Sequence, residues 1–217
     1  MSRMICIALL LVAALIPAAA CRRVGQTAQS SSSVRSRRAS TPISSPVVKA
    51  VVEAAIEQLD YTRYYDPSYV KLDYPGGDVP LDRGACTDVI IRAFRQGRVD
   101  LQQKVHEDMA LNFSAYPQKW GLSRPDANID HRRVPNLMVY FKRGGKSLTI
   151  SDNPKDYLPG DVVAWDLGGN TTHTGLVTNI ISETTGNHLI VHNIGSGVRA
   201  EDVLFSWPII GHYRYFS

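Results

Sequence analysis

Residues 161–181 read DVVAWDLGGNTTHTGLVTNII. Apolar residues fill positions 162–165 and return from Leu176 onward, on either side of the run Gly168-Gly169-Asn170. Two apolar segments separated by glycine and asparagine are typical of a β-hairpin. Further strand-like segments follow at 188–194, 202–206 and 211–216, separated by glycine-bearing or polar turns. The C-terminal part of the chain is therefore predicted to form an antiparallel sheet.

Helical periodicity precedes this hairpin. Ser45 and Pro46 suit the N-cap and the first position of a helix, and apolar residues then recur at helical spacing. Gly97 and Gly144 are suited to end two later helices. Helices followed by an antiparallel sheet make an α+β fold, with the N-terminal helices packed on the C-terminal sheet. The predicted helices cover residues 46–59, 86–96, 101–109 and 135–144.

Residues 1–20 are typical of a secretory signal peptide. Arg3 gives a positive start and an uninterrupted apolar run covers 5–16, which is shorter than the roughly 20 residues that span a bilayer. We therefore expect export to the periplasm or cell envelope. Cys21 lies where a bacterial lipoprotein carries its lipidated cysteine, although Ala18 stands where leucine is usual. Lipidation with membrane anchoring and simple cleavage before Cys21 both remain open.

The rest of the chain divides into a linker and one domain. Residues 21–45 are rich in serine and arginine and poor in large apolar side chains, which predicts a disordered basic tether. Residues 46–217 have a length that fits a single domain. The net charge of +4 is modest, and no zinc-ligand spacing or basic helix with interleaved aromatic residues is present. No nucleic acid, cofactor or metal is expected, and the oligomeric state is left undetermined.

Cys86 is the only cysteine of the predicted domain. It has no disulfide partner there and stands at the predicted start of a helix. A thiol in the first turn of a helix lies near unpaired N–H groups and the positive end of the helix dipole, which favours the nucleophilic thiolate. The alternative is a small buried apolar residue.

Two histidines follow on predicted strands. His173 can act as the general base that accepts the thiol proton. A base needs a partner that orients its second ring nitrogen, and His192 and Asn193 lie on the neighbouring predicted strand. Alternation allows only one of them to face His173; we favour His192 and leave Asn193 open. The Cys86 amide would help to hold the oxyanion.

Three segments together resemble a known group of enzymes. RGACTD at 83–88, PGDVVAW at 159–165 and HTGLV at 173–177 are similar to motifs of the papain-like peptidases, including the NlpC/P60 and CHAP cell-wall hydrolases. The stretch from about 65 to 215 resembles more closely a domain-of-unknown-function family of exported bacterial proteins. The resemblance implies a papain-like fold and a catalytic triad of Cys86, His173 and His192.

Substrate contacts are predicted around this triad. Arg132 and Arg133 lie in a polar insert, and an arginine pair can bind the carboxylates that peptide stems of the bacterial wall carry. The alternative for this insert is a solvated or internally paired loop. The full set of predicted substrate-binding residues is Asp82, Arg83, Thr87, Arg132, Arg133 and Trp165.

The expected function is therefore that of an exported cysteine hydrolase. It would cleave an amide bond of peptidoglycan, as a stem-peptide endopeptidase or an amidase, with peptidoglycan or its peptide fragments as partner. Two alternatives stay open: a thiol acyltransferase or lipid-amide hydrolase that uses the same residues, and a non-catalytic module that binds the cell envelope. A zinc amidase using His131, His173 and His192 would leave Cys86 without a role.

Overall fold

The computed structural model describes residues 39–217. The predicted signal peptide, Cys21 and most of the predicted tether lie outside these residues. Residues 39–45 were predicted to belong to the disordered tether, but residues 39–41 pair with the end of strand β4 (Thr172–Ile181): Thr41 N–H donates to Asn179 O at 2.9 Å, and Ile181 N–H donates to Ala39 O at 2.8 Å. The folded domain thus begins before residue 46, because backbone hydrogen bonds join this segment to the sheet. No helix within residues 39–217 is long and apolar enough to cross a membrane.

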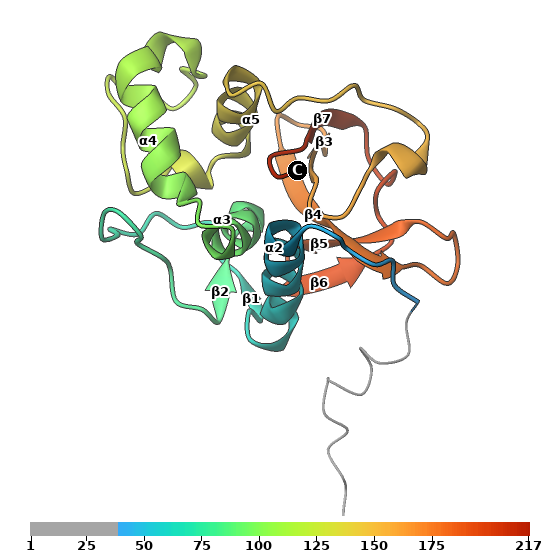
Figure 1. Ribbon diagram of the computed structural model, residues 1–217. Helices are drawn as coiled ribbons and strands as arrows, with labels where there is room; N and C mark the ends of the chain where they lie inside the picture. Colours follow the sequence, from blue (N-terminus) through green and yellow to red (C-terminus); the bar gives the residue numbers. More distant parts are fainter. Residues whose placement is uncertain (1–38) are drawn as a thin grey trace, which may run out of the picture.

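Within residues 39–217, helices α2 to α5 form one side of the fold (Figure 1). α2 and α3 pack against each other and against β4, whereas α4 lies farther from the sheet. The predicted helices agree with the structure to within a few residues, since Pro46 begins the first and Gly97 and Gly144 follow the ends of two others. Their bounds are α2 Pro46–Glu57, α3 Cys86–Gln96, α4 Leu101–Asn112 and α5 Val134–Arg143. Short 3₁₀ turns occupy Gln58–Asp60, Phe113–Ala115, Asp130–Arg132 and Pro154–Asp156.

The other side is a five-stranded antiparallel sheet in the order β6-β5-β4-β3-β7. The predicted hairpin forms β3 and β4, with Val162 opposite Leu176 and Asp166 opposite Thr172. Asn170, in the connecting turn, has a left-handed φ of 63°, which asparagine tolerates better than most residues. The predicted α+β fold, with helices on an antiparallel sheet, is confirmed. The remaining strands are β3 Val162–Asp166, β5 His188–Asn193, β6 Val198–Glu201 and β7 Ile209–Tyr213, with a two-residue parallel pair of β1 Tyr64–Tyr65 and β2 Arg83–Gly84.

One predicted strand is wrong. Residues 202–206 form a turn, and the strand precedes them at 198–201, where it pairs with β5. The apolar pattern of 202–206 has another cause, because Leu204 is buried and its carbonyl accepts a hydrogen bond from the Trp165 indole at 2.9 Å. This segment therefore covers one face of the sheet.

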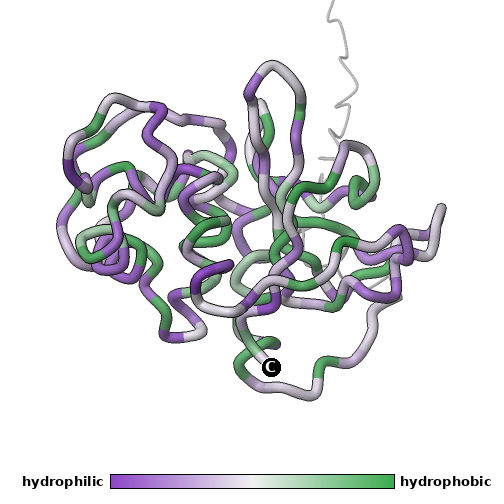
Figure 2. Tube along the Cα trace, turned by 90° about the horizontal axis from the view of Figure 1, so that it is seen from above, coloured by the Kyte–Doolittle hydropathy of each residue, from purple (hydrophilic) through white to green (hydrophobic). Residues whose placement is uncertain are grey.

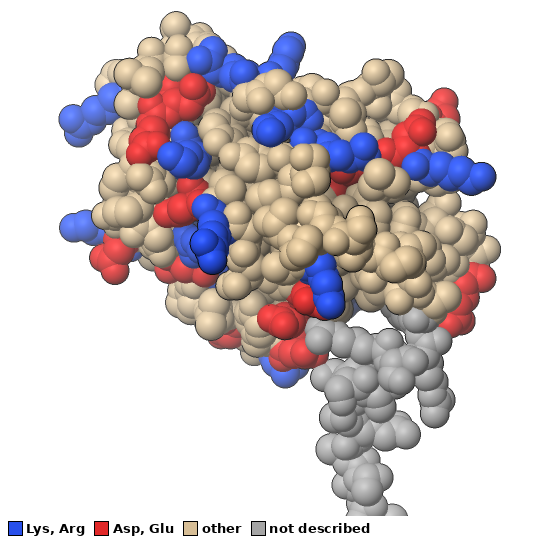
Figure 3. All heavy atoms as spheres, in the orientation of Figure 1, with Lys and Arg blue, Asp and Glu red and all other residues tan. Residues whose placement is uncertain are grey.

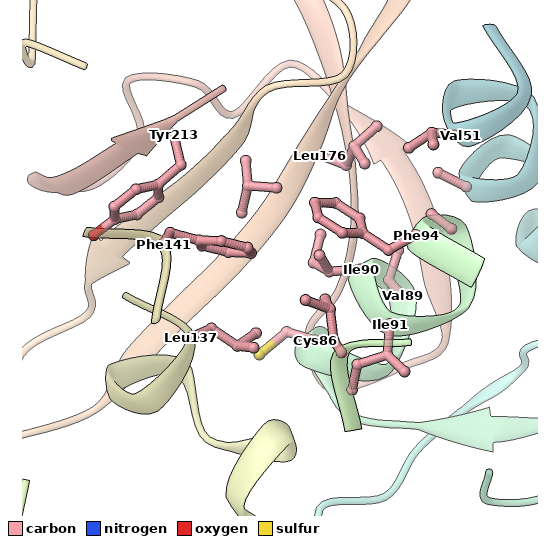
Figure 4. Close-up of a cluster of buried hydrophobic side chains, with 14 of the residues drawn as sticks. Val51, Cys86, Val89, Ile90, Ile91, Phe94, Leu137, Phe141, Leu176 and Tyr213 are labelled. Carbon is pink, nitrogen blue, oxygen red and sulfur yellow. The ribbon is translucent and has the colours of Figure 1, made fainter. Parts of the chain in front are cut away.

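Alternation along β3 divides the buried residues between the two faces of the sheet. Val162 and Ala164 belong to the main core with the helices, whereas Val163 and Trp165 belong to a smaller cluster on the other face. Figure 2 shows hydrophobic segments running through the middle of the fold. Figure 4 shows the main core, with Cys86 at its margin on the first turn of α3. The cysteine thus lies where the packed core ends.

A buried ion pair ties α3 to the segment before α5. The Asp88 carboxylate accepts hydrogen bonds from Arg132 Nε and Nη2, both at 2.9 Å, and the two side chains are only 4% and 2% exposed. The same carboxylate accepts from the Ala85 N–H at 2.6 Å, at the N-cap of α3. Arg132 also donates to the carbonyls of Asp66 and Ser68. One carboxylate therefore fixes the turn that carries Cys86.

We expect Asp88→Asn to destabilise the protein strongly. The substitution leaves the buried Arg132 guanidinium without a counter-charge, which typically costs about 3–5 kcal/mol. Urea unfolding followed by circular dichroism measures the change. Glu53→Gln is the matched control, because Glu53 and its partner Lys49 are more than half exposed and such a pair contributes about 0–1 kcal/mol. Equal, small effects of both substitutions would contradict the structural role of the pair.

Candidate active site

Cys86 is the first residue of α3, and a loop of restricted shape leads into it. Gly84 precedes it by two residues, and a Cβ on Gly84 would lie 2.9 Å from the Asp88 Cβ and 3.0 Å from its Oδ2. Only glycine therefore lets the Asp88 carboxylate fold back onto the Ala85 N–H. Asn193 of β5 holds the same loop, since its Nδ2 donates to Gly84 O at 2.8 Å and to Tyr64 O at 3.2 Å.

The Cys86 thiol is nearly buried, at 5% exposure. Burial raises its pKa to about 11, and the nearby Asp88 carboxylate adds to this, while backbone hydrogen bonds from Thr174, Thr87 and Cys86 itself lower it. The free protein therefore holds the neutral thiol and not the thiolate expected from the sequence. Desolvation of the charged form outweighs the helix terminus, so the thiol is neutral at neutral pH.

His173 lies near the start of β4, one residue before the Thr174 N–H that approaches the Cys86 sulfur. Its ring stacks on Trp165 with ring centroids 5.7 Å apart and meets Trp207 edge-on at 5.9 Å. Burial, with a smaller contribution from the neighbouring His192, lowers the pKa of His173 to about 3. His173 is therefore a neutral imidazole held in a fixed plane.

His192 lies on β5 and contacts His173 directly. His173 Nε2 and His192 Nδ1 are 2.8 Å apart, and His192 Nε2 lies 2.9 Å from Glu201 Oε2 on β6. Gly175 permits this approach, since a Cβ there would lie 2.5 Å from Ile190 Cγ2 and 3.2 Å from His192 Cβ. Of the two candidates for the orienting residue, His192 makes the contact, whereas Asn193 faces the loop before Cys86.

The Glu201 carboxylate determines which ring nitrogens of His192 and His173 carry a proton. A carboxylate accepts but does not donate hydrogen bonds, so His192 Nε2 carries a proton and donates it to Glu201. Burial lowers the pKa of His192 and keeps the ring neutral, which leaves its Nδ1 as the acceptor for His173 Nε2–H. Nδ1 of His173 is then unprotonated, as a general base requires. Glu201 was missed in the sequence because its position depends on the β5–β6 register, in which Ile190 is opposite Glu201.

The Cys86 thiol and the His173 imidazole approach β4 from opposite faces of the sheet. No hydrogen bond joins Cys86 to His173 within residues 39–217, and the sulfur instead accepts from the Thr174 N–H. Trp165 is the register partner of His173, so both side chains lie on the face of the sheet away from the helices. Cys86 reaches the strand from the helical face. The structure thus brings His173 and His192 together but leaves Cys86 on the other face of the sheet, where it contacts the backbone of the next residue, Thr174.

A surface cavity of about 550 Å³ opens over Cys86. The loop at 65–67, the insert at 119–120, the segment 132–135 and the β3–β4 turn surround it. Its lining residues are Tyr65, Pro67, Ala85, Cys86, Lys119, Trp120, Arg132, Arg133, Val134, Pro135, Asn170 and Thr172. Cys86, although nearly buried, therefore borders a space that can hold a small substrate.

Of the six predicted substrate-binding residues, only Arg132 and Arg133 line this cavity. Thr87 and Trp165 are fully buried and cannot contact a substrate: the Thr87 hydroxyl donates to Arg132 O at 3.0 Å, and Trp165 packs beneath His173. Asp82 and Arg83 lie outside the cavity and pair with each other at 3.1 Å. Arg132 itself is occupied by Asp88. For Arg133, which lines the cavity, substrate binding stays a prediction.

The alternative zinc site is not formed by the described residues. Within 39–217 no group of three or more histidine, cysteine, aspartate or glutamate side chains is arranged to hold a metal ion. His131, which this alternative required, is buried, and burial lowers its pKa to about 3.

Comparisons with known proteins give a family and an uncharacterised relative. An Escherichia coli (strain K12) protein named "Uncharacterized protein YijF" is 55% identical over 167 residues, which cover 77% of this chain and 81% of that protein. Among solved structures, NlpC1 from Trichomonas vaginalis aligns with a TM-score of 0.44 and 12% sequence identity. The alignment covers 82% of this chain and 47% of that structure, so the chain spans about half the length of NlpC1. Residues 52–215 match the family described as a domain of unknown function, DUF1287, and the chain therefore belongs to that family, as the sequence resemblance predicted.

Proposed function

We propose that this protein is an exported cysteine hydrolase that cleaves an amide bond of peptidoglycan, either within the stem peptide or at its junction with the glycan. The observation that carries the proposal is the hydrogen-bonded series from His173 through His192 to Glu201, which begins one residue before Thr174, whose backbone N–H contacts Cys86 in the lining of a cavity. In the buried His173 ring, Nε2 is held by a hydrogen bond and Nδ1 is unprotonated. Such an imidazole is suited to accept a proton from a thiol.

The reaction starts from a neutral pair. Because the pKa of Cys86 is raised to about 11 and that of His173 is lowered to about 3, the thiol proton moves to His173 Nδ1 only as the sulfur attacks the substrate carbonyl. The carbon–sulfur bond forms while the carbonyl electrons move to its oxygen. His173 Nδ1 then gives the proton to the leaving amine as the amide bond breaks. Water hydrolyses the acyl-thioester in the same way and restores the thiol.

Attack requires the sulfur to leave its present partner. In the free protein the sulfur accepts a hydrogen bond from the Thr174 N–H. Attack also requires the start of β4 to rearrange in the substrate complex, because the His173 side chain faces away from the helices and rotation about the Cα–Cβ bond of Cys86 alone does not carry the sulfur to that face. Catalytic hydrogen bonds are often long or absent without substrate and form only in the complex.

The oxyanion would be held at the start of α3. The first N–H groups of a helix have no intrahelical acceptor and lie at the positive end of its dipole. The Cys86 amide is one of these groups, because Cys86 is the first residue of α3. The negative charge on the carbonyl oxygen would therefore develop where the helix stabilises it.

The place of action follows from the predicted signal peptide and from Cys21, which lie outside the described residues. We propose that the protein acts in the periplasm or cell envelope, with membrane anchoring if Cys21 is lipidated. Peptidoglycan or its peptide fragments are the substrate proposed there.

A non-catalytic module that binds the envelope is the second candidate, and the burial of Cys86 favours it. A neutral thiol at 5% exposure, with no direct bond to His173, is also what a structural cysteine shows. The two candidates differ in whether bonds are broken, so the first experiment below separates them.

Removal of the thiol or the base should abolish cleavage. We expect the purified full chain to release muropeptides from sacculi, and Cys86→Ala and His173→Ala to lower release by at least about a thousandfold. Mass spectrometry of the released fragments identifies the bond, and circular dichroism checks the fold of each variant. Full release by Cys86→Ala would rule out the mechanism; binding of all three proteins to sacculi without any release would favour the module.

Glu201 should affect kcat rather than KM, since it contacts His192 and Arg199 and does not line the cavity. We expect turnover to fall about tenfold in Glu201→Gln, whose carbonyl oxygen can still accept from His192, and further in Glu201→Leu, which cannot. Muropeptide release against substrate concentration gives both constants. Glu183→Gln, at an exposed glutamate, is the matched control. An unchanged kcat in Glu201→Leu would mean that the carboxylate does not orient the histidines.

The pH dependence of Cys86 alkylation should follow the raised pKa. With a pKa of about 11, the thiolate fraction, and hence the rate with iodoacetamide, rises about tenfold per pH unit between about pH 7 and 9. Mass spectrometry of the tryptic peptide Gly84–Arg92 reports this cysteine alone. His173→Ala should keep the slope, because His173 is already neutral there. A plateau reached below about pH 7 would show a preformed thiolate instead.

A further inference from the structure

We propose that the cavity over Cys86 is a carboxylate-binding subsite, in which Lys119 and Arg133 hold an anionic group of a peptide substrate next to the bond that is cleaved. The inference names the substrate class of the proposed hydrolase and rests on that function for its reaction. Its evidence is separate, and comes from the charges and contacts of the cavity wall.

The lining of the cavity carries one sign of charge. Lys119, Arg132 and Arg133 are its charged residues, and none of the twelve lining residues is Asp or Glu. The general surface differs, because basic and acidic side chains are interspersed over the face that Figure 3 shows. An anionic ligand therefore meets attraction from the wall and no repulsion from a lining carboxylate.

The three basic residues differ in how far neighbouring groups already neutralise their charges. Arg132 is fully used by Asp88 and two carbonyls. Arg133 has a distant contact with Asp130, 3.4 Å from Nη1 to Oδ1. Lys119 is exposed and forms no ion pair with any residue in the described range 39–217. The cavity thus holds one unpaired cation and one that is only partly paired.

Trp120 fixes the orientation of Arg133. The guanidinium carbon lies 4.0 Å from the centre of the Trp120 ring, so the flat group is stacked on the indole. A stacked guanidinium has its N–H donors along its edge, and Nε and Nη2 of Arg133 make no hydrogen bond with the residues that the structure describes. This edge is suited to two parallel hydrogen bonds with a carboxylate. The Lys119 ammonium is 5.9 Å from the centre of the same ring.

This wall fits an anionic peptide better than an acyl chain. An acyl chain in the cavity would remove water from Lys119 and Arg133 without giving them a counter-charge, which is costly. Asn170, Thr172 and Tyr65 add hydrogen-bonding groups on the other walls. The subsite therefore supports the peptidoglycan stem, which carries carboxylates, over a lipid amide as the substrate.

Two alkylating agents of similar size test the subsite without turnover. Iodoacetate and iodoacetamide both transfer a two-carbon group to the thiolate with loss of iodide, and only iodoacetate carries a carboxylate. The rate with iodoacetate is divided by the rate with iodoacetamide, both measured at Cys86 of the full chain at about pH 8.5 through the Gly84–Arg92 peptide. This ratio is then divided by the same ratio for the free thiol 2-mercaptoethanol, which gives the normalised ratio. We expect a value of about five or more at low salt, which falls at about 0.5 M sodium chloride.

Variants assign the effect to the proposed residues. Lys119→Gln and Arg133→Gln should each lower the normalised ratio about threefold. Arg133→Lys should lower it less, because lysine keeps the charge but lacks the paired N–H donors of the guanidinium. Lys155→Gln is the matched control, because Lys155 is an exposed lysine that lines a different cavity and should leave the ratio unchanged. Lys119 is exposed, so its variant remains informative even if changes at Arg133 disturb the stacking on Trp120.

The outcomes separate this inference from the proposed function. A normalised ratio near one in the unaltered protein, or equal ratios in all variants, would overturn the subsite even if sacculi are digested. A raised ratio that depends on Lys119 and Arg133 supports the subsite even if no muropeptide is released, and in that case the hydrolase proposal alone fails.

Discussion

The Asp88 carboxylate is the interaction on which the site depends. It caps α3 at the Ala85 N–H and binds the buried Arg132 guanidinium with two hydrogen bonds. Arg132 in turn holds the carbonyls of Asp66 and Ser68, so three segments far apart in the sequence meet at one charge. Such a pair need not stabilise the fold more than apolar residues would, since both ions lose their hydration. It fixes instead where the turn before Cys86 lies relative to the insert that forms the cavity wall.

The strand β5 completes the site through alternation. His192 and Asn193 are adjacent, so their side chains lie on opposite faces of the sheet. His192 contacts His173 and Glu201 on one face, and Asn193 holds the loop before Cys86 on the other. A shift of β5 by one residue would exchange these faces and break both sets of contacts. The position of His173 and the position of the loop before Cys86 are thus set by one strand register.

Much of the fold and part of the site could be predicted from local sequence. The hairpin at 161–181 and the helix starting at Cys86 follow from apolar spacing with glycine or proline at the ends, and the structure has both. Residues 202–206 were misassigned because Leu204 is apolar for packing rather than for strand pairing. Glu201, Lys119 and Trp120 carry no local signal of a site. Their roles come from β5–β6 pairing and from the folding of the insert onto the segment before α5, and neither is visible in spacing along the chain.

The protonation of Cys86 shows why motif position alone was not sufficient. A helix N-terminus typically stabilises a negative charge by about 0.3–1 kcal/mol near the surface. A pKa raised from 9.0 to about 11 means that desolvation exceeds this gain and that of three backbone hydrogen bonds. Displacement of water by a substrate would increase that cost for an isolated thiolate. If the sulfur bonds to the carbonyl carbon while its proton moves to the imidazole, no free thiolate forms. Burial of the thiol is therefore compatible with nucleophilic attack as long as a neutral imidazole comes within reach, and burial also keeps His173 in that form.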